Sequence, residues 1–167
     1  NNNGECETAW AYGGKDNTFI GNGIANKWGW FVEYTRSCKI ILYSAGGRYT
    51  NNLAGRTGAA ALCQSSTTKP NGYVNIHAFL SVSSTDEIRD MPDKYGMPTG
   101  IPITSLNGTM IADDLKDLLD GSIDVTLRAA GVVDVSWYYW WSGSKPDGSV
   151  AVDYRNFELT CHSWTVG

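Results

Sequence analysis

Apolar and polar positions alternate most clearly between residues 28 and 44. Tryptophan, valine and tyrosine recur at every second position of residues 28–35, and an apolar run follows at residues 39–44. A period of two places successive side chains on opposite faces of a β-strand. Because residues 36–38 between the two runs suit a turn, we predict a hairpin of strands 28–35 and 39–44.

Two segments carry the signals of helices. Residues 53–64 are rich in alanine and predict a helix with a small-residue face. Ser84 and Glu87 form a capping-box pattern, which indicates the start of a second helix. We expect this helix to run to about Met91, since Pro92 disfavours its continuation.

The remaining apolar positions come in short runs bounded by Gly, Asn, Asp and Pro, which is typical of short strands joined by turns. The expected elements are an extended stretch over residues 101–110 with a turn at Asn107-Gly108, a short helix between Asp113 as N-cap and Gly121 as C-cap, strands at residues 123–127 and 132–141, and a tight turn at residues 145–148.

Composition restricts the class of protein. The chain has 167 residues, enough for one ordinary domain, and its 42% hydrophobic and 18% charged residues are typical of a globular protein. The net charge is −4 and no basic run occurs, so we expect no nucleic-acid partner. The apolar run at residues 39–43 is far shorter than the roughly 20 residues of a membrane span. We expect any signal peptide to lie outside the sequence, which begins at Asn1.

The cysteines indicate an oxidising compartment. They are Cys6, Cys38, Cys63 and Cys161, and an even number at wide spacing suits two disulfide bonds in a secreted protein. The alternative is four free thiols in a cytosolic protein. Asn107 begins the glycosylation pattern Asn-Gly-Thr, which would mark a surface glycan if the source modifies its secreted proteins.

Several segments resemble, in order, the endostatin branch of the C-type-lectin-like domains. The resemblance extends over about residues 39–165, and its carriers are the helical segment 53–64, the extended segment 76–81, residues 102–121, the sequence WSGSKPDG at residues 141–148, and the C-x-x-W spacing within residues 160–164. The resemblance implies an α+β fold with a mixed sheet and short helices, and binding as the usual role.

One departure from this family concerns its final strand. The family continues beyond the C-x-x-W segment to a strand that pairs with its first strand, whereas this sequence ends at Gly167. A sheet without that strand would leave backbone donors and acceptors unpaired. We expect strand 28–35, within an N-terminal arm of residues 1–38, to replace it in the same chain or in a neighbouring copy. The alternative is a separate hairpin that caps a shortened domain of residues 39–167.

The disulfide pairing depends on which arrangement holds. The resemblance implies the pairs Cys38–Cys63 and Cys6–Cys161, whereas the capping hairpin would give Cys6–Cys38 and Cys63–Cys161. Both pairings are open at the level of sequence.

Candidate catalytic and metal-binding residues are sparse. The histidines are His77, expected to be structural, and His162, which has no partner visible in the sequence. The S-x-x-K pattern at Ser142 lies in a turn containing Gly and Pro rather than at a helix start. The aspartates from Asp113 to Asp120 lack the ligand order of a calcium loop and are expected on a solvated helix face. We predict neither an enzyme nor a metal or cofactor site.

Aromatic residues are the strongest binding feature of the sequence, which holds seven tryptophans and nine tyrosines. One face of the alternating segment 132–141 is expected in the core, so Tyr138 and Trp140 point the other way. With Trp28 or Trp30 they would form an exposed patch that stacks on sugars or packs against another subunit. The alternative is that the N-terminal segment covers this face.

These features predict an extracellular, non-enzymatic binding or adhesion domain at a cell surface or matrix, whose partner is a glycan or a surface protein. The alternative is a structural subunit that assembles with other copies of itself into an extracellular filament or sheath. The family resemblance favours the first role, and the low charge and the missing final strand favour the second.

Overall fold

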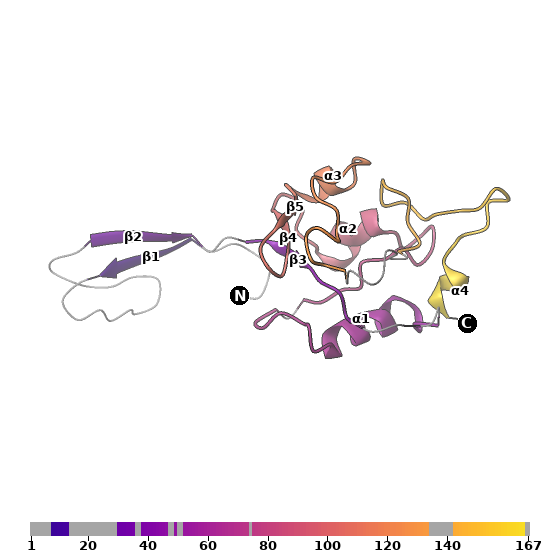
Figure 1. Ribbon diagram of the computed structural model, residues 1–167, viewed down its shortest axis with the longest axis horizontal. Coiled ribbons are helices and arrows are strands. Elements are labelled where there is room, and N and C mark those ends of the chain that lie inside the picture. The colour runs from indigo at the N-terminus through magenta and orange to yellow at the C-terminus, as the bar shows by residue number, and fades with distance from the viewer. Residues whose placement is uncertain are drawn as a thin grey trace. The chain divides into compact units, whose positions relative to one another are not determined.

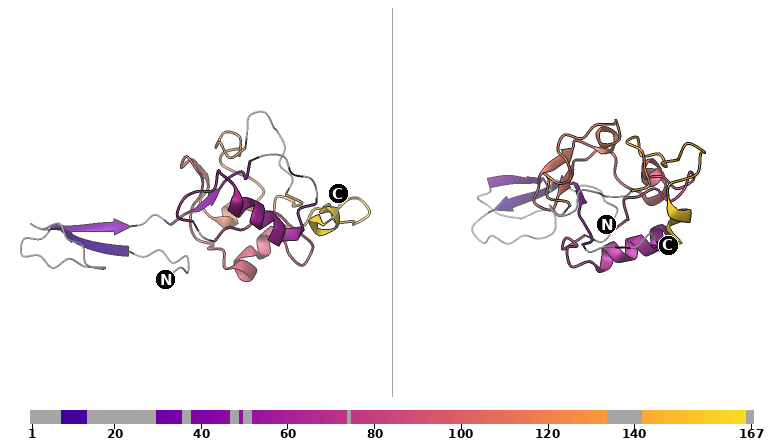
Figure 2. Two further views of the ribbon diagram at one scale, coloured as in Figure 1. Left: turned by 90° about the horizontal axis from the view of Figure 1, so that it is seen from below. Right: turned by 45° about the vertical axis from the view of Figure 1, so that its right-hand side comes forward.

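The structure of the chain is a computed structural model, shown in Figures 1 and 2. It describes residues 8–13, 30–35, 38–46, 49, 52–73, 75–133 and 142–165, and for residues 8–13 and 30–35 it describes the backbone. These residues belong to two compact units, Asn1–Lys39 and Ile40–Gly167. The predicted boundary follows residue 38.

The first unit contains a two-stranded antiparallel sheet. Strand β1 (Thr8–Gly13) pairs with β2 (Trp30–Thr35), with Tyr12 opposite Phe31. The predicted hairpin between residues 28–35 and 39–44 is therefore wrong. Residues 30–35 of its first predicted strand pair with β1. Residues 40–42 of its second predicted strand instead form a parallel pair with a strand of the other unit.

The second unit contains a mixed sheet of three short strands in the order β3 (Ile40–Leu42), β4 (Ile103–Ser105) and β5 (Met110–Ala112). Strand β3 is parallel to β4, and β4 is antiparallel to β5. The long connection between β3 and β4 follows from their parallel pairing, which no tight turn could make.

The predicted turn between the two antiparallel strands is confirmed. The Gly108 amide donates to the Ser105 carbonyl at 3.0 Å, and Gly108 has a φ of 85° that glycine adopts without steric cost. The side-chain oxygen of Asn107 accepts the Thr109 amide at 3.1 Å. This side-chain bond holds the turn together from within.

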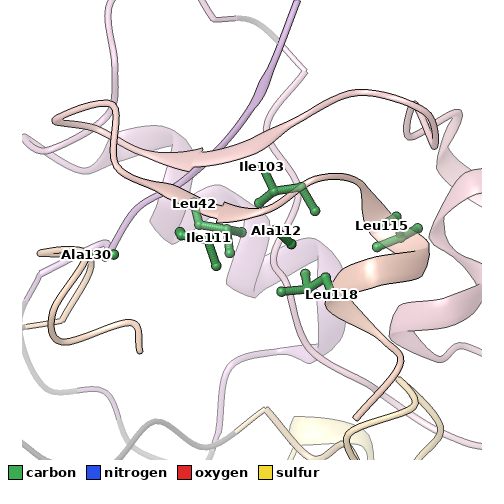
Figure 3. Packing of buried hydrophobic residues seen from close by; sticks show 7 residues of the cluster. All are labelled: Leu42, Ile103, Ile111, Ala112, Leu115, Leu118 and Ala130. Atoms are coloured by element: carbon green, nitrogen blue, oxygen red, sulfur yellow. The ribbon is translucent and has the colours of Figure 1, made fainter. Parts of the chain in front are cut away.

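One hydrophobic cluster lies between the sheet and α3 (Leu115–Leu118), as Figure 3 shows. Its buried members are Leu42, Ile103, Ile111, Ala112, Leu115, Leu118 and Ala130. The helix starts one residue later than predicted, because Asp114 and not Asp113 is its N-cap. The Asp114 carboxylate accepts the Asp117 amide at 2.9 Å.

A second cluster forms under helix α1 (Gly55–Ser65), which confirms the predicted helix at residues 53–64. Its buried members are Ala59, Ala78, Leu80 and Trp164. In Figure 1, α1 runs along one side of this unit and the sheet with α3 lies on the other. The small side chains of α1 allow the large indole of Trp164 to pack closely against it.

The predicted capping box is shifted along the chain. Glu87 and Asp90 form the box, and it starts the 3₁₀ turn η1 (Ile88–Asp90), which leads into α2 (Met91–Tyr95). Pro92 lies in the first turn of α2, so it begins this helix and does not end the previous one. The first helical turn tolerates proline because its amide groups have no partner within the helix.

Residues 123–127 do not form the predicted strand. The chain turns there, with the Ala130 amide donating to the Thr126 carbonyl at 2.9 Å and the Gly131 amide to the Arg128 carbonyl at 3.0 Å. Val125 and Leu127 pack against the first cluster from this irregular segment. Burial and local turn bonds therefore replace strand pairing. Most of the predicted strand 132–141 lies outside the described residues.

No helix in the described ranges is long and apolar enough to cross a membrane.

Candidate binding surface

The predicted aromatic patch lies outside what the structure describes. Trp28, Tyr138 and Trp140 are not among the described residues, and Trp30 belongs to β2, of which only the backbone is described. The patch therefore stays a prediction.

A different exposed aromatic surface lies on the hairpin between Val150 and Leu159. Tyr154 is 85% exposed and Phe157 is 67% exposed, with Arg155 between them. In Figures 1 and 2 the segment between residue 142 and α4 (Cys161–Trp164) projects from the helices and sheet of its unit. We call Tyr154, Arg155 and Phe157 the aromatic tip.

The turn that carries the aromatic tip is closed by side-chain and backbone bonds. The Asp153 carboxylate accepts the amides of Arg155 at 2.8 Å and Phe157 at 2.9 Å. The Asp153 amide donates to the Phe157 carbonyl at 2.9 Å. Asn156 has a φ of 64°, a left-handed conformation that asparagine tolerates better than most residues. The turn is therefore held in one shape before any partner arrives.

The base of the hairpin is tied to the core at both strands. Buried Glu87 accepts the Val150 amide at 2.7 Å, and the Leu159 amide donates to the Ala151 carbonyl at 2.7 Å. The Glu158 carboxylate accepts the Ser84 amide at 2.7 Å. These bonds fix the direction in which the aromatic tip points.

The glycines of WSGSKPDG explain why this segment supports the hairpin. Gly143 has a φ of 67°, and a Cβ atom there would lie 3.0 Å from the Ser81 carbonyl oxygen and 3.0 Å from the Trp164 ring. Gly148 has a φ of 76° and closes the predicted turn, donating to the Lys145 carbonyl at 3.0 Å. The Ala151 amide then bonds the Gly143 carbonyl at 2.8 Å. Both glycines let the backbone approach the core closely.

The segment after the hairpin is a left-handed helical turn. The φ angles of Cys161, His162, Ser163 and Trp164 are 49°, 53°, 57° and 61°. Left-handed conformations cost about 1–2 kcal/mol for each residue with a Cβ atom. The Trp164 indole offsets this strain, because it is buried and donates to the Ser81 carbonyl at 2.8 Å.

The chemistry of the aromatic tip combines a cation with two aromatic rings. The Arg155 guanidinium lies 4.9 Å from the centre of the Tyr154 ring. Salt bridges in the described part of the chain join Arg56 to Asp86 and Arg89 to Glu87, and neither includes Arg155. A stacked guanidinium keeps its in-plane donors available for a carboxylate.

A buried polar group links α1 to the turn at residues 83–86 below the hairpin. Arg56 is only 6% exposed and its Nη2 pairs with Asp86 at 2.9 Å, while its Nη1 donates to the Ala78 carbonyl at 2.8 Å. Tyr95 stacks under this guanidinium at 5.0 Å and donates to Asp86 at 3.1 Å. Every strong donor of the group has an internal partner, so we assign it a structural role.

His77 lies at the edge of this group. Its ring centroid is 5.2 Å from that of Tyr95, and the side chain is largely exposed. Partial burial, and then the positive charge of Arg56, lower the pKa of His77 from its ordinary 6.5. The surroundings of His77 therefore favour the neutral imidazole.

The cysteines depart from the predicted pairings. Cys38 is disulfide-bonded, whereas Cys63 and Cys161 carry free thiols. The pairs Cys38–Cys63, Cys63–Cys161 and Cys6–Cys161 are therefore not formed; Cys6 itself lies outside the described residues.

Packing accounts for the free thiol of Cys63. Its side chain contacts the cluster that contains Ala59 and Trp164 as a small apolar residue would, and burial raises the pKa of the thiol. The left-handed turn docks at the start of α1, where the Leu53 amide donates to the Trp164 carbonyl at 2.8 Å. From Gly55 to Cys63 the helix rises about 12 Å, too far for a disulfide across it.

The other candidate residues occupy the surface. Asn107 is exposed and its side-chain oxygen serves the turn, so its glycosylation stays a prediction. Asp114 and Asp117 accept backbone amides around α3. Among the described side chains, no group of three or more His, Cys, Asp or Glu residues is placed to hold a metal ion.

Comparison with known proteins gave no match: no family model, no curated protein and no solved structure matches this chain.

Proposed function

We propose that this chain is an extracellular, non-enzymatic binding or adhesion domain of a cell surface or matrix, and that it contacts a glycan or a surface protein through the aromatic tip. The observation that carries the proposal is the exposure of Tyr154 and Phe157 on a turn whose backbone is already held by Asp153. Tyrosine and arginine are enriched among residues that dominate binding energy. A turn that is ordered before binding loses less conformational entropy in the complex.

Two further observations support the extracellular and lectin-like parts of the proposal. The disulfide at Cys38 suits an oxidising compartment. The mixed sheet, the short helices and the constrained glycines of WSGSKPDG suit an endostatin-type C-type-lectin-like domain. We propose this fold class for the second unit.

The test is binding of the purified chain to an array of polysaccharides and matrix proteins. We expect Tyr154→Ala with Phe157→Ala to weaken binding at least about tenfold, because both rings are lost while the turn bonds of Asp153 remain. Tyr73→Ala is the matched control, since Tyr73 is also exposed but lies outside the hairpin. Equal binding by the double variant and the wild type would refute the role of the aromatic tip.

A second function, a structural subunit of a self-assembling extracellular filament or sheath, is favoured by the distribution of charge. The residues that carry the net charge are concentrated in one stretch of the second unit.

A further inference from the structure

We propose that the aromatic tip of one copy docks on an acidic surface around α3 of the next copy. This inference rests on the proposed function of the aromatic tip and names its partner as a second copy of this chain. We define the acidic surface as Asp113, Asp120 and Asp124 together with the exposed apolar side chains of Met110 and Ile123.

The stretch of residues 113–124, which contains these three aspartates, has the same net charge as the whole chain. Residues 113–124 contain five aspartates and one lysine, a net charge of 1 − 5 = −4, and the whole chain has 13 − 17 = −4. The remaining residues therefore sum to zero. An approaching cation is attracted to this stretch.

Part of this charge is available to a partner. Asp113, Asp120 and Asp124 are exposed, and the structure describes no hydrogen bond or ion pair to the carboxylates of Asp113 and Asp124. Asp114 and Asp117, by contrast, accept backbone amides around α3. Two carboxylates are thus free to meet a guanidinium.

Exposed apolar side chains lie close to these aspartates in the sequence: Ile123 directly precedes Asp124, and Met110 lies three positions before Asp113. Met110 is 41% exposed and Ile123 is 43% exposed. On the other surface, Tyr154 and Phe157 flank the Arg155 cation. Each surface therefore offers charge beside apolar area, with charges of opposite sign. Complementary charge sets the register of a contact, and buried aromatic area supplies most of its affinity.

The position of the two surfaces makes the contact intermolecular. In Figure 1 the hairpin with the aromatic tip projects away from α3 of the same chain. One copy would therefore offer its tip to a second copy and its acidic surface to a third. Such a head-to-tail contact joins unlike surfaces, so it closes into a ring or continues as a filament.

Two variants, each with the charge of one of the two surfaces reversed, test this contact. The tip variant is Arg155→Glu, and the surface variant is Asp113→Lys with Asp124→Lys. All three side chains are exposed, and none of their substitutions removes a hydrogen bond or ion pair that the structure describes. Lys94→Glu, on the exposed side of α2, makes the same charge change as the tip variant elsewhere.

Light scattering after size exclusion of the full chain is the measurement. We expect wild type and Lys94→Glu to associate as concentration rises, and each of the other variants alone to associate at least about tenfold more weakly. A 1:1 mixture of the tip and surface variants should recover association. In the mixture, the negative tip of one variant meets the positive surface of the other, and the positive tip of the second meets the negative surface of the first. Within either variant alone, tip and surface carry charge of the same sign.

Several results would overturn the proposal. They are a wild type that stays monomeric at millimolar concentration, a tip or surface variant that associates as the wild type does, and a mixture that associates no better than its components. The proposed binding function is judged separately by the array. A monomer whose array binding depends on Tyr154 and Phe157 would reject the self-contact and keep that function.

Discussion

Among single residues, Gly143 has little room for a side chain. Its φ of 67° and the 3.0 Å approach of its hypothetical Cβ atom to Ser81 and Trp164 both oppose a side chain. We expect Gly143→Ala to lower the free energy of unfolding by about 1–3 kcal/mol, because strain and overpacking add. Urea denaturation measures this loss. Gly100→Ala is the control, since no atom lies within 4 Å of a Cβ there, and an equal loss in both variants would contradict the prediction.

His77 makes stability depend on pH. Its pKa is lowered from 6.5 in the folded chain, so the unfolded chain binds the proton at higher pH than the folded chain does. Stability is therefore lost as pH falls below 6.5 towards the folded pKa. Between about pH 7.5 and about pH 5.5, the melting temperature of His77→Gln should fall less than that of wild type. Identical slopes for His77→Gln and wild type would rule out the effect.

Between elements, the ion pair of Arg56 and Asp86 connects α1 to the turn beneath the hairpin. Asp86→Ala leaves a guanidinium that is 6% exposed without its carboxylate, and we expect it to lower the free energy of unfolding by about 3–5 kcal/mol. In an Arg56→Met background the same change should cost much less, because no buried charge remains. Denaturant unfolding of the four proteins measures the coupling. Equal costs in both backgrounds would show that the pair is not coupled.

Elements stabilised by nearby residues were predictable, and elements that depend on distant residues were not. Alanine-rich α1 and the turn at Asn107-Gly108 obey local rules, so the sequence indicated both. Strand pairing is different: the alternating pattern of residues 28–35 showed a strand, yet its partner β1 lies far upstream. A short, polar connection suggested the wrong hairpin.

The errors around Pro92 and residues 123–127 have the same origin. Ser84-Glu87 and Glu87-Asp90 are both acceptable capping boxes by spacing, and the long-range bond from Val150 to Glu87 accompanies the second. Val125 and Leu127 are apolar at alternate positions, as in a strand. They instead pack on the core from turns whose bonds run between close neighbours.

At the scale of the whole molecule, the aromatic tip was beyond sequence reasoning because its support comes from distant segments. Ser84, Glu87 and Ser81 hold the hairpin or its neighbours through bonds that span more than sixty positions. The local signal was the Asp-x-x-Asn sequence of residues 153–156, which follows Val152 and precedes Phe157. The aromatic content of the sequence pointed instead to Trp28, Trp30, Tyr138 and Trp140.

The concentration of charge at residues 113–124 also gives the second unit an electric dipole. An immobile cationic surface would attract the unit through that stretch and so select one orientation from many. The hairpin, which projects away from α3, would then be left facing the solution. The molecules of a single adsorbed layer would thus share one orientation, and each would expose its tyrosine, arginine and phenylalanine to ligands in solution.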